Sequence, residues 1–262
     1  MRAVVLAAGR GRRMGHHTAD RPKCLVELGG RTLLERQVVA LRAAGAAEVA
    51  VVAGWRADLF DDSGLTVFVN DRWATTTMVE SLATAHSWLS DGPVLVSYGD
   101  IVYSAATVRA LAAARQDLAI AYDPGWRPLW ERRFARPLDD AETFRLHGAG
   151  LPGTGLPGTG LGGAGLLAEI GGRPTSADEV QGQYVGLLRF TPAGWAVVSD
   201  VLLTEPAVRG LDLTGLLRFL LRERGLPIGA TPVSGPWCEF DHPADLAIGL
   251  EILDELDGVE AA

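Results

Sequence analysis

The chain has 262 residues and a formal net charge of −8, and 48% of its residues are hydrophobic against 21% charged. These proportions are those of a folded protein with a substantial core, which excludes a disordered chain. The negative charge argues against general nucleic-acid binding, which requires a basic face. No apolar stretch approaches the roughly 20 residues of a membrane span, and two cysteines give no disulfide framework. We therefore expect a cytoplasmic protein.

In the first half of the chain, short β-rich segments alternate with segments of helical periodicity. Strands are predicted at 4–7, 48–53, 65–69, 93–98 and 118–122, and helices at 33–44, 77–89 and 107–114. This alternation is typical of a parallel sheet covered by helices, which binds ligands beyond the carboxyl ends of its strands. The predicted fold class is α/β, in the form of a Rossmann-like three-layer sandwich with a mostly parallel mixed sheet.

The pattern changes after Tyr122, where a Trp- and Arg-rich segment precedes a glycine-dominated one. Gly-Leu-Pro-Gly-Thr at 150–154 is repeated at 155–159, which is typical of a flexible surface tip and too short for a repeat architecture. Later elements are predicted as strands at 183–190, 228–233 and 237–240 and as helices at 212–224 and 243–256. We predict one domain, 1–262, in which an insert at 123–190 covers the active edge of the sheet and carries a flexible glycine-rich tip at 148–165.

A cationic, glycine-containing loop follows the first predicted strand. Gly9 and Gly11 allow a tight turn whose backbone N–H groups can hold phosphates, and Arg10 and Arg13 add positive charge. Lys23, a little downstream, is the only lysine among 24 Lys and Arg residues. Because Lys is a compact point charge and Arg a planar fork, a single Lys in an Arg-rich chain indicates a specific chemical role. The alternative is a merely solvated basic loop.

Two common phosphate-binding fingerprints are missing from this loop. A dinucleotide fingerprint G-x-G-x-x-G that begins at Gly9 would need a glycine where the chain has Met14. The chain also lacks the G-x-x-x-x-G-K-[ST] motif of a P-loop. These observations argue against a nicotinamide-dependent oxidoreductase and against a P-loop NTPase.

Three carboxylates stand at or near predicted strand ends. Asp100 follows an apolar strand, which places it at the carboxyl edge of the sheet. Glu239 and Asp241 are two positions apart, so an extended chain would place both on one face. Carboxylates together with substrate phosphates are the ligands that Mg²⁺ prefers. A helix cap or turn is the alternative role for a lone Asp.

Residues 6–14 (LAAGRGRRM) and 22–25 (PKCL) resemble the two-part signature of the nucleoside-triphosphate transferase family. The resemblance implies that the loop backbone holds the nucleobase and phosphates of a nucleotide. It implies two catalytic residues, Arg13 on the departing pyrophosphate and Lys23 between the reacting phosphate groups. Asp100 and Asp241 match the metal-binding aspartates of the family, and Glu239 would either bind the Mg²⁺ ion or support a ligand.

Segments 97–103, 137–142 and 181–186 resemble cytidylyltransferases that act on phosphocholine and on phosphonates, use CTP and release pyrophosphate. The family often has Asn before the Met-x-x-Ser-Leu run that binds the nucleotide, whereas this chain has Thr77. The residues expected to bind the nucleotide lie in the first loop, in this run and after the fourth strand: Leu6, Ala8, Gly9, Arg10, Gly11, Thr77, Ser81 and Gly99.

The Trp- and Arg-rich segment gives contradictory indications about the acceptor. Trp126, Trp130 and Trp237 would suit an aromatic box for a quaternary ammonium such as choline. Four arginines at 127–136 suit an acceptor with extra negative charge. The alternative is that the tryptophans are core and the arginines solvated. We favour a small, phosphonoformate-like phosphonate, and the expected acceptor-binding residues are Arg127, Trp130, Arg133, Gln183 and Tyr184.

The expected function is Mg²⁺-dependent transfer of CMP from CTP to a small anionic phosphonate or phosphate ester, in a setting of natural-product biosynthesis. Three rivals remain: a phosphocholine cytidylyltransferase, a sugar-1-phosphate nucleotidyltransferase and a catalytically silent nucleotide-binding subunit. The silent subunit would lack the lysine or a metal carboxylate, and the chain has both kinds of residue. The sequence is compatible with a homodimer.

Overall fold

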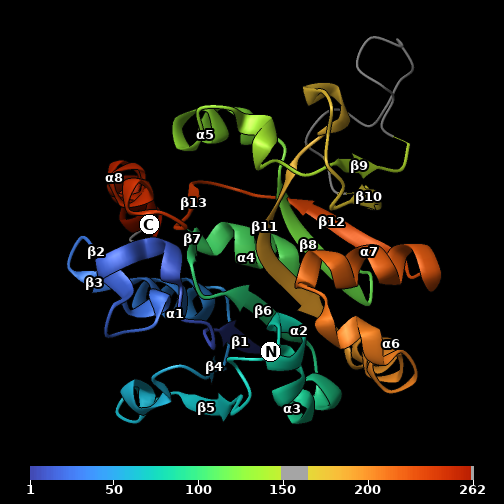
Figure 1. Cartoon of the computed structure of the whole chain (residues 1–262), viewed down its shortest axis with the longest axis horizontal. Coiled ribbons are helices and arrows are strands. Elements are labelled where there is room, and N and C mark those ends of the chain that lie inside the picture. The colour runs from blue at the N-terminus through green and yellow to red at the C-terminus, as the bar shows by residue number, and fades with distance from the viewer. Residues whose placement is uncertain (149–164, 261–262) are drawn as a thin grey trace.

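The computed structural model describes residues 1–148 and 165–260, and within them nine strands form one central sheet. The strand order is β5-β4-β1-β6-β11-β8-β12-β10-β9, as the fan of arrows in Figure 1 shows. The strands of this sheet are β1 (Arg2–Leu6), β4 (Glu48–Ala53), β5 (Thr66–Val69), β6 (Val94–Tyr98), β8 (Leu118–Asp123), β9 (Phe144–Leu146), β10 (Gly165–Ile170), β11 (Gln183–Phe190) and β12 (Ile228–Pro232).

The sheet is mixed and mostly parallel, which confirms the predicted fold class. β1 pairs in parallel with β4 and β6, and β12 pairs in parallel with β8. β11 runs antiparallel between β6 and β8. Side chains of β1 alternate between two cores, because Val4 and Leu6 pack on one face of the sheet and Ala3 and Val5 on the other.

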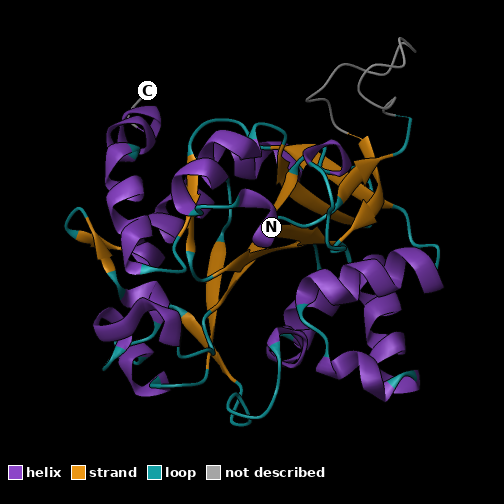
Figure 2. Ribbon diagram, turned by 45° about the horizontal axis from the view of Figure 1, so that its top comes forward, coloured by secondary structure: helices purple, strands orange, loops and turns teal. Residues whose placement is uncertain are grey.

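Helices cover both faces of the sheet, and Figure 2 shows them on either side of the strands. One face is covered by α2 (Met78–Thr84), α3 (His86–Asp91), α6 (Pro192–Thr204) and α7 (Leu213–Glu223). The other face is covered by α1 (Leu33–Ala43), α4 (Ala105–Ala112) and α5 (Trp126–Arg133). The result is a three-layer α/β sandwich.

A smaller third hydrophobic core lies beside the sheet and includes the last described helices. It joins two short ribbons to two helices: β2 (Glu27–Leu28) with β3 (Arg31–Thr32), β7 (Ile101–Tyr103) with β13 (Trp237–Glu239), α8 (Pro243–Glu251) and α9 (Leu253–Glu260). Short 3₁₀ helices are η1 (Arg12–Thr18), η2 (Lys23–Leu25), η3 (Ala57–Phe60), η4 (Pro137–Asp139), η5 (Ala177–Glu179) and η6 (Pro206–Gly210). None of the described helices is long and apolar enough to span a membrane.

The structure differs from the sequence-based elements at several places. The helix expected at 77–89 breaks at Ala85 into α2 and α3, and the one expected at 243–256 breaks at Ile252. The range 123–190 contributes β9, β10 and β11 to the central sheet, so its last strand is part of the scaffold as well as of the predicted insert. Most of the predicted glycine-rich tip, 149–164, lies outside the described residues.

Candidate active site

The loop after β1 opens onto a pocket at the carboxyl ends of the parallel strands, the edge at which such sheets bind ligands. The pocket brings together six of the predicted nucleotide-binding residues with Lys23 and Asp100. Its lining residues are Leu6, Ala7, Ala8, Gly9, Gly11, Lys23, Cys24, Met78, Ser81, Gly99 and Asp100. Three of them, Ala7, Cys24 and Met78, had not been assigned to the site from the sequence, although each lies within a segment that carries the family resemblance.

Two glycines of this pocket are required by close contacts. Gly11 has a left-handed backbone with φ of 68°, and a Cβ there would lie 2.9 Å from the Cβ of Lys23. A Cβ on Gly99 would lie 2.7 Å from the carbonyl oxygen of Leu6. The loop and Lys23 therefore pack directly against each other, and β6 ends against β1, only because both positions lack a side chain.

Arg10 and Thr77 are the two predicted nucleotide-binding residues that do not line the pocket in the described structure. The Arg10 guanidinium lies 5.0 Å from the ring centroid of Trp55. The Thr77 hydroxyl donates a hydrogen bond to the carbonyl oxygen of Arg209 at 2.8 Å, while its own carbonyl accepts one from the Ser81 hydroxyl. Thr77 thus sits one residue before the lining residue Met78 and helps to orient Ser81.

The three predicted metal-binding carboxylates meet because β7 and β13 form an antiparallel ribbon. Ile101 is paired with Glu239 in this ribbon, and the backbone N–H of Phe240 donates to the carbonyl oxygen of Asp100 at 2.9 Å. One oxygen from each of Asp100, Glu239 and Asp241 consequently lies within 4.8 Å of the others. Residues far apart in the sequence thus form one acidic cluster at the edge of the pocket.

Lys23 lies between two of these carboxylates, and only 10% of its side chain is exposed. Its Nζ lies 2.8 Å from Asp100 Oδ2 and 3.0 Å from Asp241 Oδ1. Burial alone would lower the pKa of Lys23, but the attraction of Asp100 and Asp241 outweighs burial and raises it. Lys23 is therefore charged, and it pairs with two of the three carboxylates of the acidic cluster.

Arg13 reaches the cluster from the first loop, with its Nη2 2.7 Å from Asp241 Oδ1. Burial would raise the pKa of Asp241, but Lys23 and Arg13 outweigh it and lower the pKa, so this carboxylate is ionised. The two predicted catalytic cations, Arg13 and Lys23, thus converge on one oxygen atom.

The cluster fits a divalent cation. Asp100 Oδ1 is buried and has no hydrogen-bond partner among the described residues, so one ligand oxygen is available. Burial, together with repulsion from Asp241, raises the pKa of Glu239 to about 7, and a nearby cation would relieve this repulsion. A set made only of carboxylate oxygens suits Mg²⁺. Asp100, Glu239 and Asp241 are the residues that would hold it.

Two buried residues that had not been predicted support the acidic cluster. Gln37 on α1 donates through its Nε2 to the carbonyl oxygens of Tyr98, at 2.8 Å, and Ile101, which fixes the turn that carries Asp100. Asp245 in the first turn of α8 accepts hydrogen bonds from the backbone N–H of Asp241 at 2.8 Å. The sequence signal for Asp245 was its place three residues after His242 at a helix start with Pro243.

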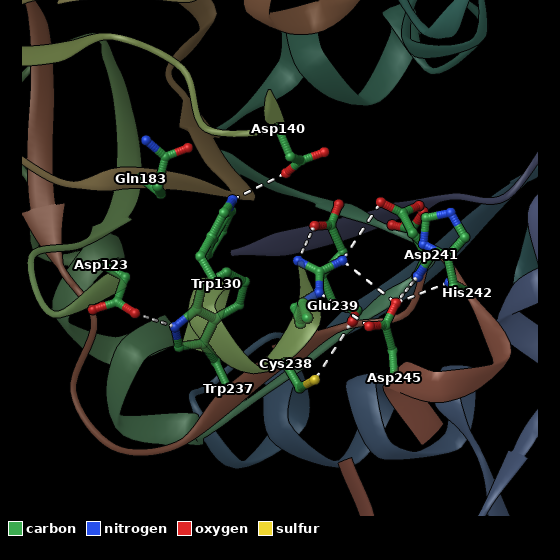
Figure 3. A network of polar contacts seen from close by, with 12 residues as sticks. Asp123, Trp130, Asp140, Gln183, Trp237, Cys238, Glu239, Asp241, His242 and Asp245 are labelled. Atoms are coloured by element: carbon green, nitrogen blue, oxygen red, sulfur yellow. Dashed lines mark hydrogen bonds and ion pairs between the residues drawn. The ribbon is translucent and has the colours of Figure 1, made fainter. Parts of the chain in front are cut away.

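Most residues expected to bind the acceptor are engaged in contacts within the chain. Arg127 lies on the surface, with 64% of its side chain exposed, and pairs with Glu131 at 2.7 Å. Trp130 is 3% exposed, and its indole N–H donates to Asp140 Oδ2 at 3.0 Å, as Figure 3 shows. The side chain of Arg133 has no exposed surface and faces the acidic cluster.

The other two acceptor candidates lie at the start of β11. Gln183 is buried; its Nε2 donates to the carbonyl oxygen of Glu142 at 2.7 Å and its Oε1 accepts from the Glu142 N–H at 3.2 Å. Tyr184 packs edge-on against Tyr98, with ring centroids 5.7 Å apart, and burial raises its pKa. Tyr98 directly precedes the Gly99-Asp100 turn. Tyr184 thus packs beside the end of β6, and its buried hydroxyl has no hydrogen-bond partner among the described residues.

Trp126, Trp130 and Trp237 are buried together rather than arranged around an open space. All three belong to the core between the sheet and α5, and Trp130 lies 5.9 Å from Trp126 and 6.1 Å from Trp237 between ring centroids. The Trp237 indole N–H donates to Asp123 Oδ2 at 2.9 Å (Figure 3). The core interpretation of these tryptophans agrees with the structure better than an aromatic box for choline.

The MobA-like NTP transferase domain family matches residues 3–150, which is more than half of the chain and includes the first loop, Lys23 and Asp100. The chain belongs to this family. The resemblance stated from the motifs alone is thereby confirmed.

Known relatives agree with this assignment. The CTP:phosphoglutamine cytidylyltransferase of Campylobacter jejuni is 30% identical over 269 residues, which cover 96% of this chain and 100% of the relative. The CMP-5'-(3-aminopropyl)phosphonate synthase of Streptomyces rubellomurinus is 34% identical over 137 residues, 49% of this chain and 22% of the relative. The inositol-1-phosphate CTP transferase of T. maritima shares the fold, with a TM-score of 0.72 and 18% identity over 98% of this chain and 96% of that chain.

Proposed function

We propose that the protein is a Mg²⁺-dependent cytidylyltransferase that transfers CMP from CTP to a small phosphonate or phosphate ester and releases pyrophosphate. The observation that carries this proposal is that Lys23 pairs with both Asp100 and Asp241 beside the pocket lined by the glycine-containing loop. The names of two relatives support this proposal: a CTP:phosphoglutamine cytidylyltransferase names CTP and a phosphorus-containing acceptor, and a CMP-5'-(3-aminopropyl)phosphonate synthase names a CMP-linked phosphonate.

In the proposed reaction, an acceptor oxygen attacks the α-phosphorus of CTP. A bond forms between that oxygen and the α-phosphorus, and the bond from the α-phosphorus to the oxygen that bridges to the β-phosphate breaks, so pyrophosphate leaves. The step needs no nucleophile from the protein. Catalysis then consists of holding two anions together and compensating their repulsion.

The chain's own residues divide this work between them. Backbone groups at Leu6, Ala8 and Gly9 would hold the nucleotide, with Gly11, Ser81 and Gly99 shaping the pocket; Arg10 and Thr77 would act from its border. Lys23 would contact the reacting phosphates, and Arg13 the departing pyrophosphate. When bound, Mg²⁺ held by Asp100, Asp241 and Glu239 would neutralise phosphate charge. Lys23 pairs with two of these carboxylates in the structure, and it would move from them toward the nucleotide as the site fills.

The acceptor would bind on the side of the nucleotide pocket where β11 and α5 lie. The exposed Arg127 is the acceptor-binding candidate best able to reach a bound molecule, whereas Trp130, Arg133, Gln183 and Tyr184 would act through their packing. The burial of the three tryptophans argues against phosphocholine. A small anionic phosphonate, including the phosphonoformate-like compound expected from the arginines, and an amino-acid phosphate such as phosphoglutamine are the acceptors to test first.

The test measures pyrophosphate release from CTP, UTP, GTP and dTTP with each of several acceptors: phosphoglutamine, phosphonoformate, 2-aminoethylphosphonate, phosphocholine and sugar 1-phosphates. The proposal predicts release only with CTP, only in the presence of a divalent cation, and with a phosphonate or phosphoglutamine as the best acceptor. Lys23→Ala serves as the inactive control. A clear preference for UTP or dTTP with a sugar 1-phosphate would contradict the proposal and support the sugar-nucleotide alternative.

A further inference from the structure

Arg133, the last residue of α5, directs its guanidinium into the acidic cluster. Its side chain has no exposed surface. The Nη1 atom lies 2.9 Å from Glu239 Oε2, the Nε atom 3.2 Å from Asp245 Oδ1, and the Nη2 atom 3.6 Å from Asp241 Oδ2. One guanidinium therefore contacts three carboxylates, two of which are candidate metal ligands.

These contacts use different oxygens from those used by the catalytic cations. Lys23 and Arg13 both contact Asp241 through Oδ1, whereas Arg133 faces Oδ2. Arg133 also contacts Glu239 through Oε2 alone. Arg133 thus holds Glu239 and Asp241 through one oxygen each and orients the planes of their carboxylates. Residues that hydrogen-bond to metal ligands orient those ligands in the same way.

Asp245 on α8 connects the Arg133 guanidinium to the backbone of the acidic cluster. Its Oδ2 accepts hydrogen bonds from the backbone N–H groups of Asp241 and His242, both at 2.8 Å, and Figure 3 shows Asp245 beneath these two residues and beside Glu239. The Arg133 guanidinium is itself held by aromatic rings, 5.4 Å from the centroid of Trp130 and 5.0 Å from that of Phe134. The positions of Glu239 and Asp241 therefore depend on a buried group that is fixed on several sides.

We infer that Arg133 is a positioning residue of the divalent-cation site, which acts by orienting Glu239 and Asp241 rather than by touching the acceptor. This inference rests on the proposed metal site. A guanidinium whose nitrogens face three carboxylates, and which is shielded from solvent, is poorly placed to receive a phosphonate. Lysine cannot replace it, because an ammonium is a point charge and cannot reach three carboxylates with a planar fork.

The test compares Arg133→Lys with Arg132→Lys in the full-length chain. Arg132 is the preceding residue on the same helix, is exposed and pairs with Glu251, so it is a matched control. Free Mn²⁺ is measured by electron paramagnetic resonance during titration of each folded protein, without nucleotide or acceptor. Arg133→Lys should weaken Mn²⁺ binding by about 10-fold or more, which is the usual effect of substituting a residue that holds a metal ligand in place. Arg132→Lys should bind Mn²⁺ like the wild type.

A second variant keeps the test decisive where Arg133→Lys does not fold. Asp245→Asn removes the charge that pairs with Arg133 but retains an oxygen for the backbone N–H groups of Asp241 and His242. It should also weaken Mn²⁺ binding severalfold. The inference would be overturned if both variants fold and bind Mn²⁺ with the affinity of the wild type. It would also be overturned if Arg133→Lys binds Mn²⁺ normally and only its KM for the acceptor rises.

Asp100→Asn separates this inference from the proposed function. Loss of Mn²⁺ binding in Asp100→Asn, with normal binding in Arg133→Lys, would overturn the role of Arg133 and leave the metal site intact. Equal Mn²⁺ binding by the wild type and Asp100→Asn would overturn the metal site itself, and the inference would fall with it.

Discussion

The loop after β1 and the helix α5 carry a similar density of arginine, yet the two regions use it differently. In the loop, Gly9 and Gly11 line a pocket that is open to a ligand, and Arg13, with 61% of its side chain exposed, pairs with Asp241. On α5, Arg127 and Arg132 pair with surface carboxylates, and Arg133 is buried against the chain's own acidic cluster.

The two regions differ in whether their backbone groups line a pocket. The loop has glycines that allow its backbone to lie close to Lys23. Because glycine has no side chain, the N–H groups of the loop can be approached by a phosphate. No residue of α5 lines this pocket in the described structure, and carboxylates of the same protein pair with its arginines. Arginine content alone therefore does not identify an acceptor site.

Asp100→Asn is the substitution expected to have the largest effect on the loop side. It removes the charge of the carboxylate that has an available oxygen and that pairs with Lys23. kcat/KM for CMP transfer should fall by at least about 100-fold, the loss typical of removing one electrostatic stabiliser of a transition state. Asp139→Asn, at an exposed ion pair near α5, is the control and should retain activity. Normal turnover in Asp100→Asn would contradict the metal assignment.

Lys23→Met should change activity and metal binding in opposite directions. kcat should fall by about 100-fold, because a charge beside the reacting phosphates is lost. Mn²⁺ affinity without nucleotide should instead increase, since the ammonium no longer interacts with Asp100 Oδ2 and Asp241 Oδ1. Steady-state kinetics and Mn²⁺ titration measure the two effects. Weaker Mn²⁺ binding in this variant would show that Lys23 supports the cluster rather than competing for it.

Trp130→Ala tests the opposite property on the α5 side. Because the ring is buried between Trp126 and Trp237, its removal should lower the free energy of unfolding by about 3–5 kcal/mol. Urea denaturation followed by far-UV circular dichroism gives this value. A loss below about 0.5 kcal/mol, as expected for an exposed side chain, would mean that the ring is available to a ligand after all.

The pH dependence of metal binding should reflect Glu239. Its pKa is raised to about 7 by burial and by repulsion from Asp241, so a proton competes with the metal at and below neutral pH. Mn²⁺ affinity should be constant above pH 7 and fall by up to about 10-fold per pH unit below it. Glu239→Gln should bind Mn²⁺ more weakly at pH 8 but without this dependence. An identical pH profile in Glu239→Gln would exclude this carboxylate.

Arg127→Ala should have the smallest effect. The Arg127–Glu131 pair is exposed on α5, so the free energy of unfolding should change by less than about 0.5 kcal/mol. If Arg127 contacts the acceptor, KM for the acceptor should rise severalfold while kcat is retained. A KM equal to that of the wild type would exclude Arg127 as an acceptor-binding residue.

Residues of the site that follow a strand or lie in a compact motif were predicted from the sequence. Lys23 stood out as a solitary lysine, and Asp100 followed an apolar strand that proved to be β6. Glu239 and Asp241 were expected on one face of an extended chain; β13 ends at Glu239, yet an oxygen of each lies within 4.8 Å of the other. In each case a local pattern fixes where the side chain lies relative to the edge of the sheet.

The parts that were not predicted depend on contacts between distant segments. Gln37 is 61 positions from Tyr98, and no pattern around it on α1 indicates that its amide holds that turn. Arg133 was expected at the acceptor because its neighbours are arginines, but its burial is decided by the position of β13 and α8. The helix α6 was also missed, because its apolar residues show little helical periodicity.

The role of Asp100 and Asp241 as metal ligands is tested most directly by a crystal structure of the protein with Mn²⁺ and CTP, in which the ion is located by its anomalous scattering. We expect an ion within about 2.5 Å of oxygens from Asp100 and Asp241, with the Lys23 ammonium moved from these carboxylates to the phosphates. An ion bound elsewhere, with Lys23 still between the two aspartates and away from the nucleotide, would contradict it.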